Sequence, residues 1–125
     1  MLDIIVENQA GRIRVQLTGR LDTDTYASCS ERLRPLLTPS TRVLVLDLAG
    51  VSFLSSMGLR VLMQTTKTMA AHGGKCLLAR PQTPVRKVIE IANALPRETI
   101  FESIEEADRY FTVIQQRARE EEAGK

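Results

Sequence analysis

Runs of alternating or continuous apolar residues divide the chain into strands. Residues 2–6 and 13–17 alternate apolar and polar side chains on either side of a loop that contains Gly11, which predicts an antiparallel hairpin. Residues 43–48 are almost continuously apolar, as expected for a strand covered on both faces. Residues 75–79 predict a further strand, so the pattern indicates a sheet that begins with a hairpin.

Apolar residues at helical spacing predict two helices before residue 73. Asp22 or Thr23 can cap the first helix, and Pro39 ends it. The second helix follows the strand at residues 43–48 and stops at Gly73 and its glycine neighbour. The positions that we expect these helices to bury are Tyr26, Cys29, Leu33, Leu36 and Leu37 in the first, and Leu59, Leu62, Met63, Thr66 and Ala70 in the second.

The last third of the chain adds a helix, a strand and a helix. Thr83 is expected to cap a helix with Pro84 at its first position, and Pro96 closes that helix. Residues 99–101 predict a brief strand, and Ser103, with a glutamate three residues later, forms a capping box for a final helix. The expected buried positions are Val85, Val88, Ile89 and Ala92, and then Ile104, Ala107, Phe111 and Ile114.

The resulting order, β-β-α-β-α-β-α-β-α, predicts an α/β fold. We expect a mixed sheet in which an N-terminal hairpin is followed by parallel β-α units, with right-handed crossovers and helices packed on the sheet. A length of 125 residues with 43% hydrophobic and 26% charged residues suits one domain. No linker or repeat separates a second domain, so we expect a domain over residues 1–116 and a charged tail over residues 117–125.

Composition argues against several classes of function. A net charge of +2 with mixed signs, and only three Phe and two Tyr, disfavour nucleic-acid binding. No apolar stretch approaches the roughly 18 residues of a membrane span, and the start of the chain does not resemble a signal peptide, so we expect a cytoplasmic protein. Cys29 and Cys76 lack paired spacing and are expected to be reduced. The sequence has no glycine-rich phosphate loop, no metal-ligand cluster and no histidine other than His72. We therefore expect that the protein is not an enzyme and binds no cofactor or metal.

Two hydroxyls lie where the strand at residues 43–48 gives way to the second helix. Ser55 and Ser56 fall at or beside the helix N-terminus, where free N–H groups and the helix dipole favour an oxygen as a cap or, if phosphorylated, as an anion. Gly58, in the first turn, costs about 1 kcal/mol relative to alanine. We therefore expect a close backbone approach at this glycine.

Other residues near the serines have a structural and a functional interpretation. Met57, Val61 and Thr68 are expected to lie off the buried stripe, which gives a small apolar ridge in solvent. This ridge either docks a partner or is covered by a neighbouring helix. Asp22 and Asp47 are expected to form hydrogen bonds or caps rather than to act as a carboxylate pair.

Three segments together resemble the STAS domain of bacterial anti-sigma factor antagonists, from about Leu2 to Phe111. They read LTGRLD from residue 17, LDLAGVSFLSSMGL from residue 46, and GG at residues 73–74. In that family the strand exit usually reads Asp-Ser-Ser/Ala-Gly-Leu, and the serine after the aspartate is phosphorylated by a partner kinase that is also the anti-sigma factor. The resemblance implies that Ser56 is the phosphoacceptor, with Ser55 as the alternative.

The resemblance also implies a function. An unphosphorylated antagonist binds the anti-sigma factor kinase and frees the sigma factor, phosphorylation of the serine ends this binding, and a serine phosphatase resets the cycle. A monomer that forms heteromeric complexes is expected. The partner-binding residues so implied are Asp22, Thr23, Ser55, Ser56, Met57, Gly58 and Val61.

This chain departs from the family pattern at three positions. Ser55 stands where the family usually has aspartate, Met57 where it has a small residue, and Arg20 where it has an acidic one. The missing aspartate favours an alternative function, a constitutive STAS scaffold or accessory subunit in which Ser56 is not phosphorylated.

Overall fold

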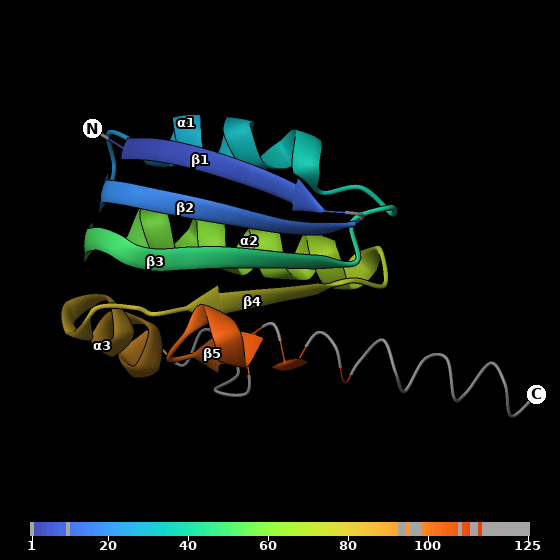
Figure 1. The fold of residues 1–125 in the computed structure, drawn as a ribbon. Coiled ribbons are helices and arrows are strands. Elements are labelled where there is room, and N and C mark those ends of the chain that lie inside the picture. The colour runs from blue at the N-terminus through green and yellow to red at the C-terminus, as the bar shows by residue number, and fades with distance from the viewer. Residues whose placement is uncertain are drawn as a thin grey trace, which may run out of the picture.

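One mixed sheet organises the molecule. The computed structural model describes residues 2–9, 11–92, 95, 99–107, 109–110 and 113. Within this part the strands follow the order β1-β2-β3-β4-β5 (Figure 1). Their bounds are Leu2–Gln9 for β1, Arg12–Leu21 for β2, Val43–Leu54 for β3, Lys75–Ala79 for β4 and Ile100–Phe101 for β5. β1 pairs antiparallel with β2 and all other neighbours are parallel, which confirms the predicted hairpin and β-α units.

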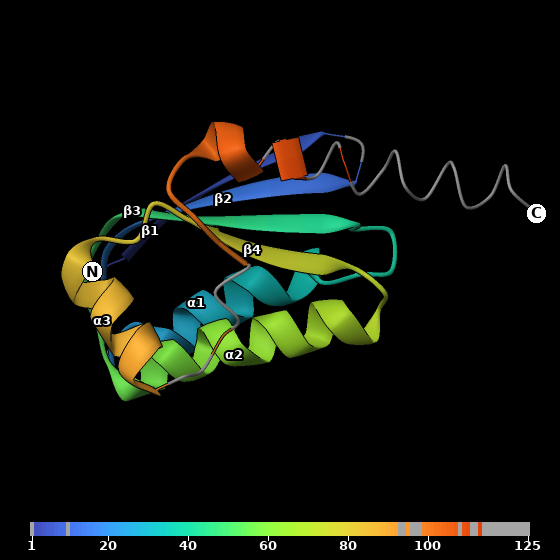
Figure 2. The ribbon, with the colours of Figure 1, turned by 90° about the horizontal axis from the view of Figure 1, so that it is seen from below.

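The helices lie on both faces of this sheet. Helix α1 spans Tyr26–Leu33 and continues into a short 3-10 helix, η1, over Arg34–Leu36; α2 spans Ser56–Ala71 and α3 spans Thr83–Ala92. These helices cover one face, whereas a helical turn at residues 104–107 lies over the other (Figure 2). No helix in the described part of the chain has both the length and the apolar character to cross a membrane.

The central strand β3 is covered on both faces, as its sequence predicted. On one side, Leu44, Leu46 and Leu48 belong to the large core beneath the helices. On the other side, Val43 and Val45 form a smaller core with Leu77 and Ala79 of β4 and Ala107 of the helical turn at residues 104–107. β3 is therefore the best anchored element of the sheet.

Strands β2 and β3 run further than the hydrophobic pattern indicated. β3 continues to Leu54, six residues beyond the predicted end, because its second half stays paired with β2 as far as Leu21. The register shifts between Gln16 and Thr18 and again after Gly19, so this half does not alternate regularly. β1 also runs to Gln9, which shortens the expected hairpin loop.

The predicted start and end of α1 were wrong. The helix begins after Thr25, and neither Asp22 nor Thr23 caps it; the Asp22 carboxylate instead accepts a hydrogen bond from the Asp24 N–H at 3.0 Å, a turn that competes with helix capping. The helix ends at Leu33, well before Pro39. Pro35 lies in η1, since it has no N–H to continue an α-helical ladder.

Later helix ends follow the predictions more closely. α3 begins at Thr83, so Thr83 is inside the helix, and Gln82 accepts the first backbone hydrogen bond, from the Arg86 N–H at 2.8 Å. The capping box is half formed: Ser103 Oγ accepts from the Glu106 N–H at 3.1 Å, but the Glu106 carboxylate accepts from the N–H of Glu102.

Most of the expected buried positions are at least partly covered. Val85 and Ile89 are buried and Val88 is half-buried, whereas Ala70 of α2 and Ala92 of α3 are exposed, since each lies near the end of its helix. Pro96, Phe111, Ile114 and the predicted tail at residues 117–125 lie outside the described residues.

Candidate partner-docking site at the junction of β3 and α2

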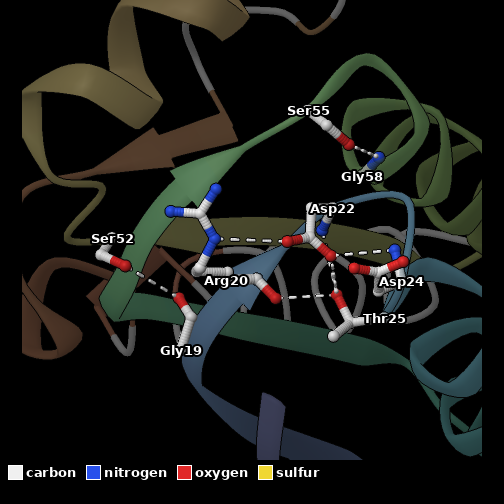
Figure 3. A network of polar contacts seen from close by, with 8 residues as sticks. All are labelled: Gly19, Arg20, Asp22, Asp24, Thr25, Ser52, Ser55 and Gly58. Carbon is white, nitrogen blue, oxygen red and sulfur yellow. Dashed lines mark hydrogen bonds and ion pairs between the residues drawn. The ribbon is translucent and has the colours of Figure 1, made fainter. Parts of the chain in front are cut away.

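Ser55 is the N-cap of α2. Its Oγ accepts a hydrogen bond from the Gly58 N–H at 3.1 Å, and its backbone is extended (φ −86°, ψ 173°) (Figure 3). Its own N–H donates to the Leu21 carbonyl at 3.0 Å. Ser55 thus ties the start of α2 to the end of β2, as a cap with a fixed place in the sheet.

Ser56 is the first residue of α2, and its side chain is exposed. Within the described residues its hydroxyl has no hydrogen-bond partner. The 16-residue helix places the positive end of its dipole at this serine. The capping role therefore falls to Ser55, which leaves the Ser56 hydroxyl available to another protein.

Gly58 is buried where α2 meets β2, which confirms the expected close approach. A Cβ at this position would lie 2.4 Å from the Leu21 carbonyl oxygen and 2.8 Å from Leu21 Cγ. Only glycine lets the first turn of α2 come this near to the strand. The position of both serines depends on this contact.

Arg20, Asp22 and Phe53 form a polar and aromatic cluster beside the junction. Arg20 Nε donates to Asp22 Oδ2 at 3.3 Å (Figure 3). In addition, Arg20 Cζ lies 4.2 Å from the centroid of the Phe53 ring, a cation–π contact. Phe53 is 40% exposed. Sequence spacing did not reveal this contact, because it depends on the pairing of Arg20 with Phe53 that follows the register shift.

The Asp22 carboxylate is held in its charged form. Desolvation raises its pKa, but hydrogen bonds from the Asp24 N–H, from Arg20 and from Thr25 outweigh that effect, so its pKa lies below the ordinary 3.8. The Thr25 hydroxyl lies 3.2 Å from Asp22 Oδ1 (Figure 3). Asp22 is the centre of a local turn, while Thr23 is an exposed residue of that turn.

The predicted apolar ridge on α2 is not in solvent. Val61 is only 4% exposed and belongs to the large core, while Met57 and Thr68 are half-buried. Of the two alternatives, coverage by a neighbouring helix is confirmed: α1 packs beside α2, and Cys29 and Leu33 of α1 lie in the same core as Val61. A cavity of about 360 Å³ remains between the two helices, and Tyr26, Met57 and Val61 are among its lining residues.

Asp47 lies apart from Asp22, and the two do not form a carboxylate pair. Asp47 is 3% exposed and forms an ion pair with Arg80, whose Nε donates to Asp47 Oδ1 at 3.2 Å. The Ala49 N–H donates to the same oxygen at 3.1 Å. Asp47 therefore has a structural role, the hydrogen bonding that its sequence position indicated.

The remaining candidate groups are structural as well. Cys29 and Cys76 are buried and unpaired, and burial raises the pKa of Cys29 to about 11 and that of Cys76 to about 12. His72 is the C-cap of α2, as expected from the glycine that follows it. Among the described residues, no group of three or more His, Cys, Asp or Glu side chains could hold a metal ion.

Comparison with solved structures finds the same fold in anti-sigma factor antagonists. The Bacillus cell fate determinant SpoIIAA, an anti-sigma factor antagonist solved in its unphosphorylated form, is 18% identical with a TM-score of 0.76, over 88% of this chain and 96% of that chain. An anti-sigma factor antagonist from Mycobacterium paratuberculosis is 23% identical with a TM-score of 0.75, over 88% and 93%.

The fold also occurs as one part of an anion transporter. The murine anion transporter Slc26a9 is 21% identical with a TM-score of 0.72, over 86% of this chain but only 18% of the transporter chain. At these identities the structural likeness establishes a shared fold. The sequence also establishes the family, because the family model of the STAS domain matches residues 3–107. The chain therefore belongs to the STAS domain family.

Proposed function

We propose that this STAS domain is an anti-sigma factor antagonist that works by partner switching. Unphosphorylated, it binds an anti-sigma factor that is also a serine kinase, and so frees the sigma factor. Phosphorylation of Ser56 ends this binding, and a serine phosphatase restores it. The domain acts in the cytoplasm, as a monomer that enters heteromeric complexes, and is not itself an enzyme.

This proposal rests on the different environments of the two serines. Ser55 Oγ is engaged as the helix cap, whereas the Ser56 hydroxyl is exposed and free of partners within the described chain. A kinase can therefore reach Ser56 without disturbing the cap. In the transfer, Ser56 Oγ bonds to the γ-phosphorus of ATP, the bond from that phosphorus to ADP breaks, and a base of the kinase takes the hydroxyl proton.

A phosphate on Ser56 need not unfold the domain. It adds about −1.5 to −2 charges and three acceptor oxygens at the positive end of α2, where a negative charge is stabilised. An interface built around the neutral hydroxyl would instead have to bury an unpaired phosphate. Each ~1.4 kcal/mol of this cost lowers affinity tenfold, so loss of the partner is the expected result.

The fold likeness to SpoIIAA supports this assignment, since that protein has been solved in both an unphosphorylated and a phosphorylated form. Slc26a9 points to a second candidate function, because there the same fold is one part of a transporter. Ser55 favours this second candidate, a constitutive scaffold or accessory subunit: a neutral serine occupies the place of the family's aspartate next to Ser56. In such a scaffold, binding would not depend on Ser56.

A pull-down from native-cell lysate tests the proposal. The baits are the wild-type chain, Ser56→Asp, Ser56→Ala and Ser28→Asp, the last placing the same negative charge on an exposed serine of α1. We expect wild type, Ser56→Ala and Ser28→Asp to retain a protein kinase that binds a sigma factor, and Ser56→Asp to lose it.

Each alternative outcome has a clear meaning. Equal retention by all four baits would support the ungated scaffold. A partner set without any such kinase would contradict the anti-sigma factor antagonist function itself. Mass spectrometry of the wild-type chain from the same cells then locates the phosphate, at Ser56 or at Ser55.

A further inference from the structure

A groove runs between α1 and α2 and begins beside Ser56. Two adjoining cavities, of about 360 and 400 Å³, share Ser30, Arg34 and Gln64. Met57, which follows Ser56, lines the first cavity, and Thr68 lines the second. The groove thus follows most of the length of α2 away from the candidate phosphoacceptor.

The walls of this groove are basic. Arg60 and Arg34 line the first cavity, Lys67 lines the second, and Glu31 is the one acidic residue among the lining residues of the two. Within the described part of the chain, these three basic side chains form no ion pair or side-chain hydrogen bond. Apolar atoms of Tyr26, Met57 and Leu37 contribute to the same surface. A segment that carries carboxylates and apolar side chains together fits this groove.

Ser56 and Arg60 lie four residues apart on α2, so they are neighbours on one face of the helix. Side chains at this spacing have Cβ atoms about 5–6 Å apart, and a negative group that precedes a cation by four residues is the favourable arrangement. Lys67 lies seven residues beyond Arg60 and continues the same face. The groove and the candidate phosphoacceptor therefore share Arg60.

We propose that Arg60 couples Ser56 to this groove, which binds an acidic, amphipathic segment of the partner protein. With a free hydroxyl at Ser56, the Arg60 guanidinium is available to the carboxylates of that segment. With phosphate at Ser56, the guanidinium pairs with the phosphate oxygens one helical turn away, and the groove loses part of its positive charge. This inference rests on the proposed phosphorylation of Ser56 and adds the surface that senses it.

Installing phosphoserine at position 56 by genetic encoding tests the coupling without any kinase. In the full chain, we expect the ³¹P titration midpoint of the phosphoserine to lie at a lower pH with Arg60 present than in Arg60→Gln, because a paired guanidinium favours the dianion. Arg32→Gln, an exposed basic residue of α1 that does not line the groove, is the matched control and should leave the midpoint unchanged. Equal midpoints in wild type and Arg60→Gln would overturn the coupling.

The groove itself is tested with a synthetic probe. This is a fluorescein-labelled amphipathic peptide with leucines on one face and glutamates on the other, compared with a peptide that has lysines in place of the glutamates. At low salt we expect Arg34→Gln, Arg60→Gln and Lys67→Gln each to weaken binding of the glutamate peptide roughly threefold, whereas Arg32→Gln leaves it unchanged. Phosphoserine at position 56 should weaken it too, and less so in Arg60→Gln.

Three outcomes would overturn the docking surface. Equal binding of the lysine peptide would mean that the groove has no preference for carboxylates. Equal loss in Arg32→Gln would mean that the peptide responds to the overall positive charge of the domain and not to the groove. Stronger binding after deletion of residues 117–125 would assign the groove to the chain's own Glu120–Glu122 instead of a partner. If cells never phosphorylate Ser56 but the titration and peptide results hold, the proposed function fails while the groove stands.

Discussion

Asp47, in the middle of β3, forms an ion pair with Arg80, which directly follows the last residue of β4, and the two partners differ in burial. The Asp47 side chain is 4% exposed, whereas the Arg80 side chain is 44% exposed. Arg80 also adopts a positive φ of 56°, unusual for a residue with a side chain, and donates its N–H to the Phe101 carbonyl at 2.8 Å. One arginine thus connects β3, β4 and β5.

We expect Asp47→Ala to lower the free energy of unfolding by about 1–3 kcal/mol. Loss of the buried acceptor leaves the Ala49 N–H without its partner, while Arg80 can turn to solvent, which limits the loss. Glu7→Ala breaks the exposed pair with Arg14 and should cost no more than about 1 kcal/mol. Urea unfolding of both variants measures this, and equal losses would contradict the structural role of Asp47.

The two serines should differ in their effect on stability. Ser55→Ala removes the cap of α2 and should cost about 1 kcal/mol in urea unfolding. Ser56→Ala should change the free energy of unfolding by less than about 0.5 kcal/mol, because its hydroxyl is exposed and unbonded within the described chain. A larger loss for Ser56→Ala than for Ser55→Ala would reverse the assignment of cap and candidate phosphoacceptor.

Gly58→Ala should destabilise the domain by about 2–3 kcal/mol, because the new methyl group would overlap the Leu21 carbonyl. Gly73 provides the contrast: its φ is +79°, but no atom lies within 4 Å of an added Cβ. Gly73→Ala should cost only about 1–2 kcal/mol, and Gly73→Asn less, since asparagine tolerates that conformation. Because asparagine is larger than alanine, Gly58→Asn should lower the melting temperature at least as much as Gly58→Ala. A smaller fall for Gly58→Asn in thermal unfolding would contradict the steric explanation.

The buried cysteines should make the protein less stable at alkaline pH. Burial raises the pKa of Cys29 to about 11 and that of Cys76 to about 12, from an ordinary 9.0. Below pH 9 both thiols are neutral whether the chain is folded or unfolded, so this contribution is fully present. Above pH 9 the unfolded chain loses these protons first, and the contribution is lost as the pH rises through 11.

Urea unfolding midpoints at pH 8 and pH 10.5 measure this change, with the double variant Cys29→Ala, Cys76→Ala as the control. We expect the midpoint of the wild type to fall more between the two pH values than that of the variant. Parallel falls would show that other groups cause the alkaline loss.

Sequence patterns predicted those elements whose burial is regular. The run of apolar residues in β3 and the spacing of Val85 and Ile89 in α3 follow directly from which faces are covered. The second half of β3 was missed because its pairing with β2 shifts register near Thr18, and a strand that changes register shows no simple alternation. The start of α1 was missed because the Asp22 side chain can either cap a helix or accept a hydrogen bond within a local turn. In the structure it forms the turn.

The candidate site was predictable where it depends on a single strand and helix, and not where it depends on packing between distant segments. The positions of Ser55, Ser56 and Gly58 follow from a strand that leads into a helix, and the structure adds which serine is the cap. The burial of Val61 depends on how α1 packs against α2, and the stacking of Arg20 on Phe53 depends on strand register. Both are contacts between distant segments, which the period of a single helix or strand does not encode.

The position of β3 in the middle of the sheet predicts how fast backbone amide protons near the serines exchange with solvent. Residues 43–47 of β3 lie between β2 and β4 and are covered on both faces, so their amides should exchange with deuterium only when the whole domain unfolds. β1, at the edge of the sheet, has mostly exposed side chains and should exchange much sooner. Ser56 lies two residues after the end of β3, and the intervening Ser55 is hydrogen-bonded to Leu21 of β2, so a partner would meet its target on a fixed support while the far edge of the sheet opens and closes.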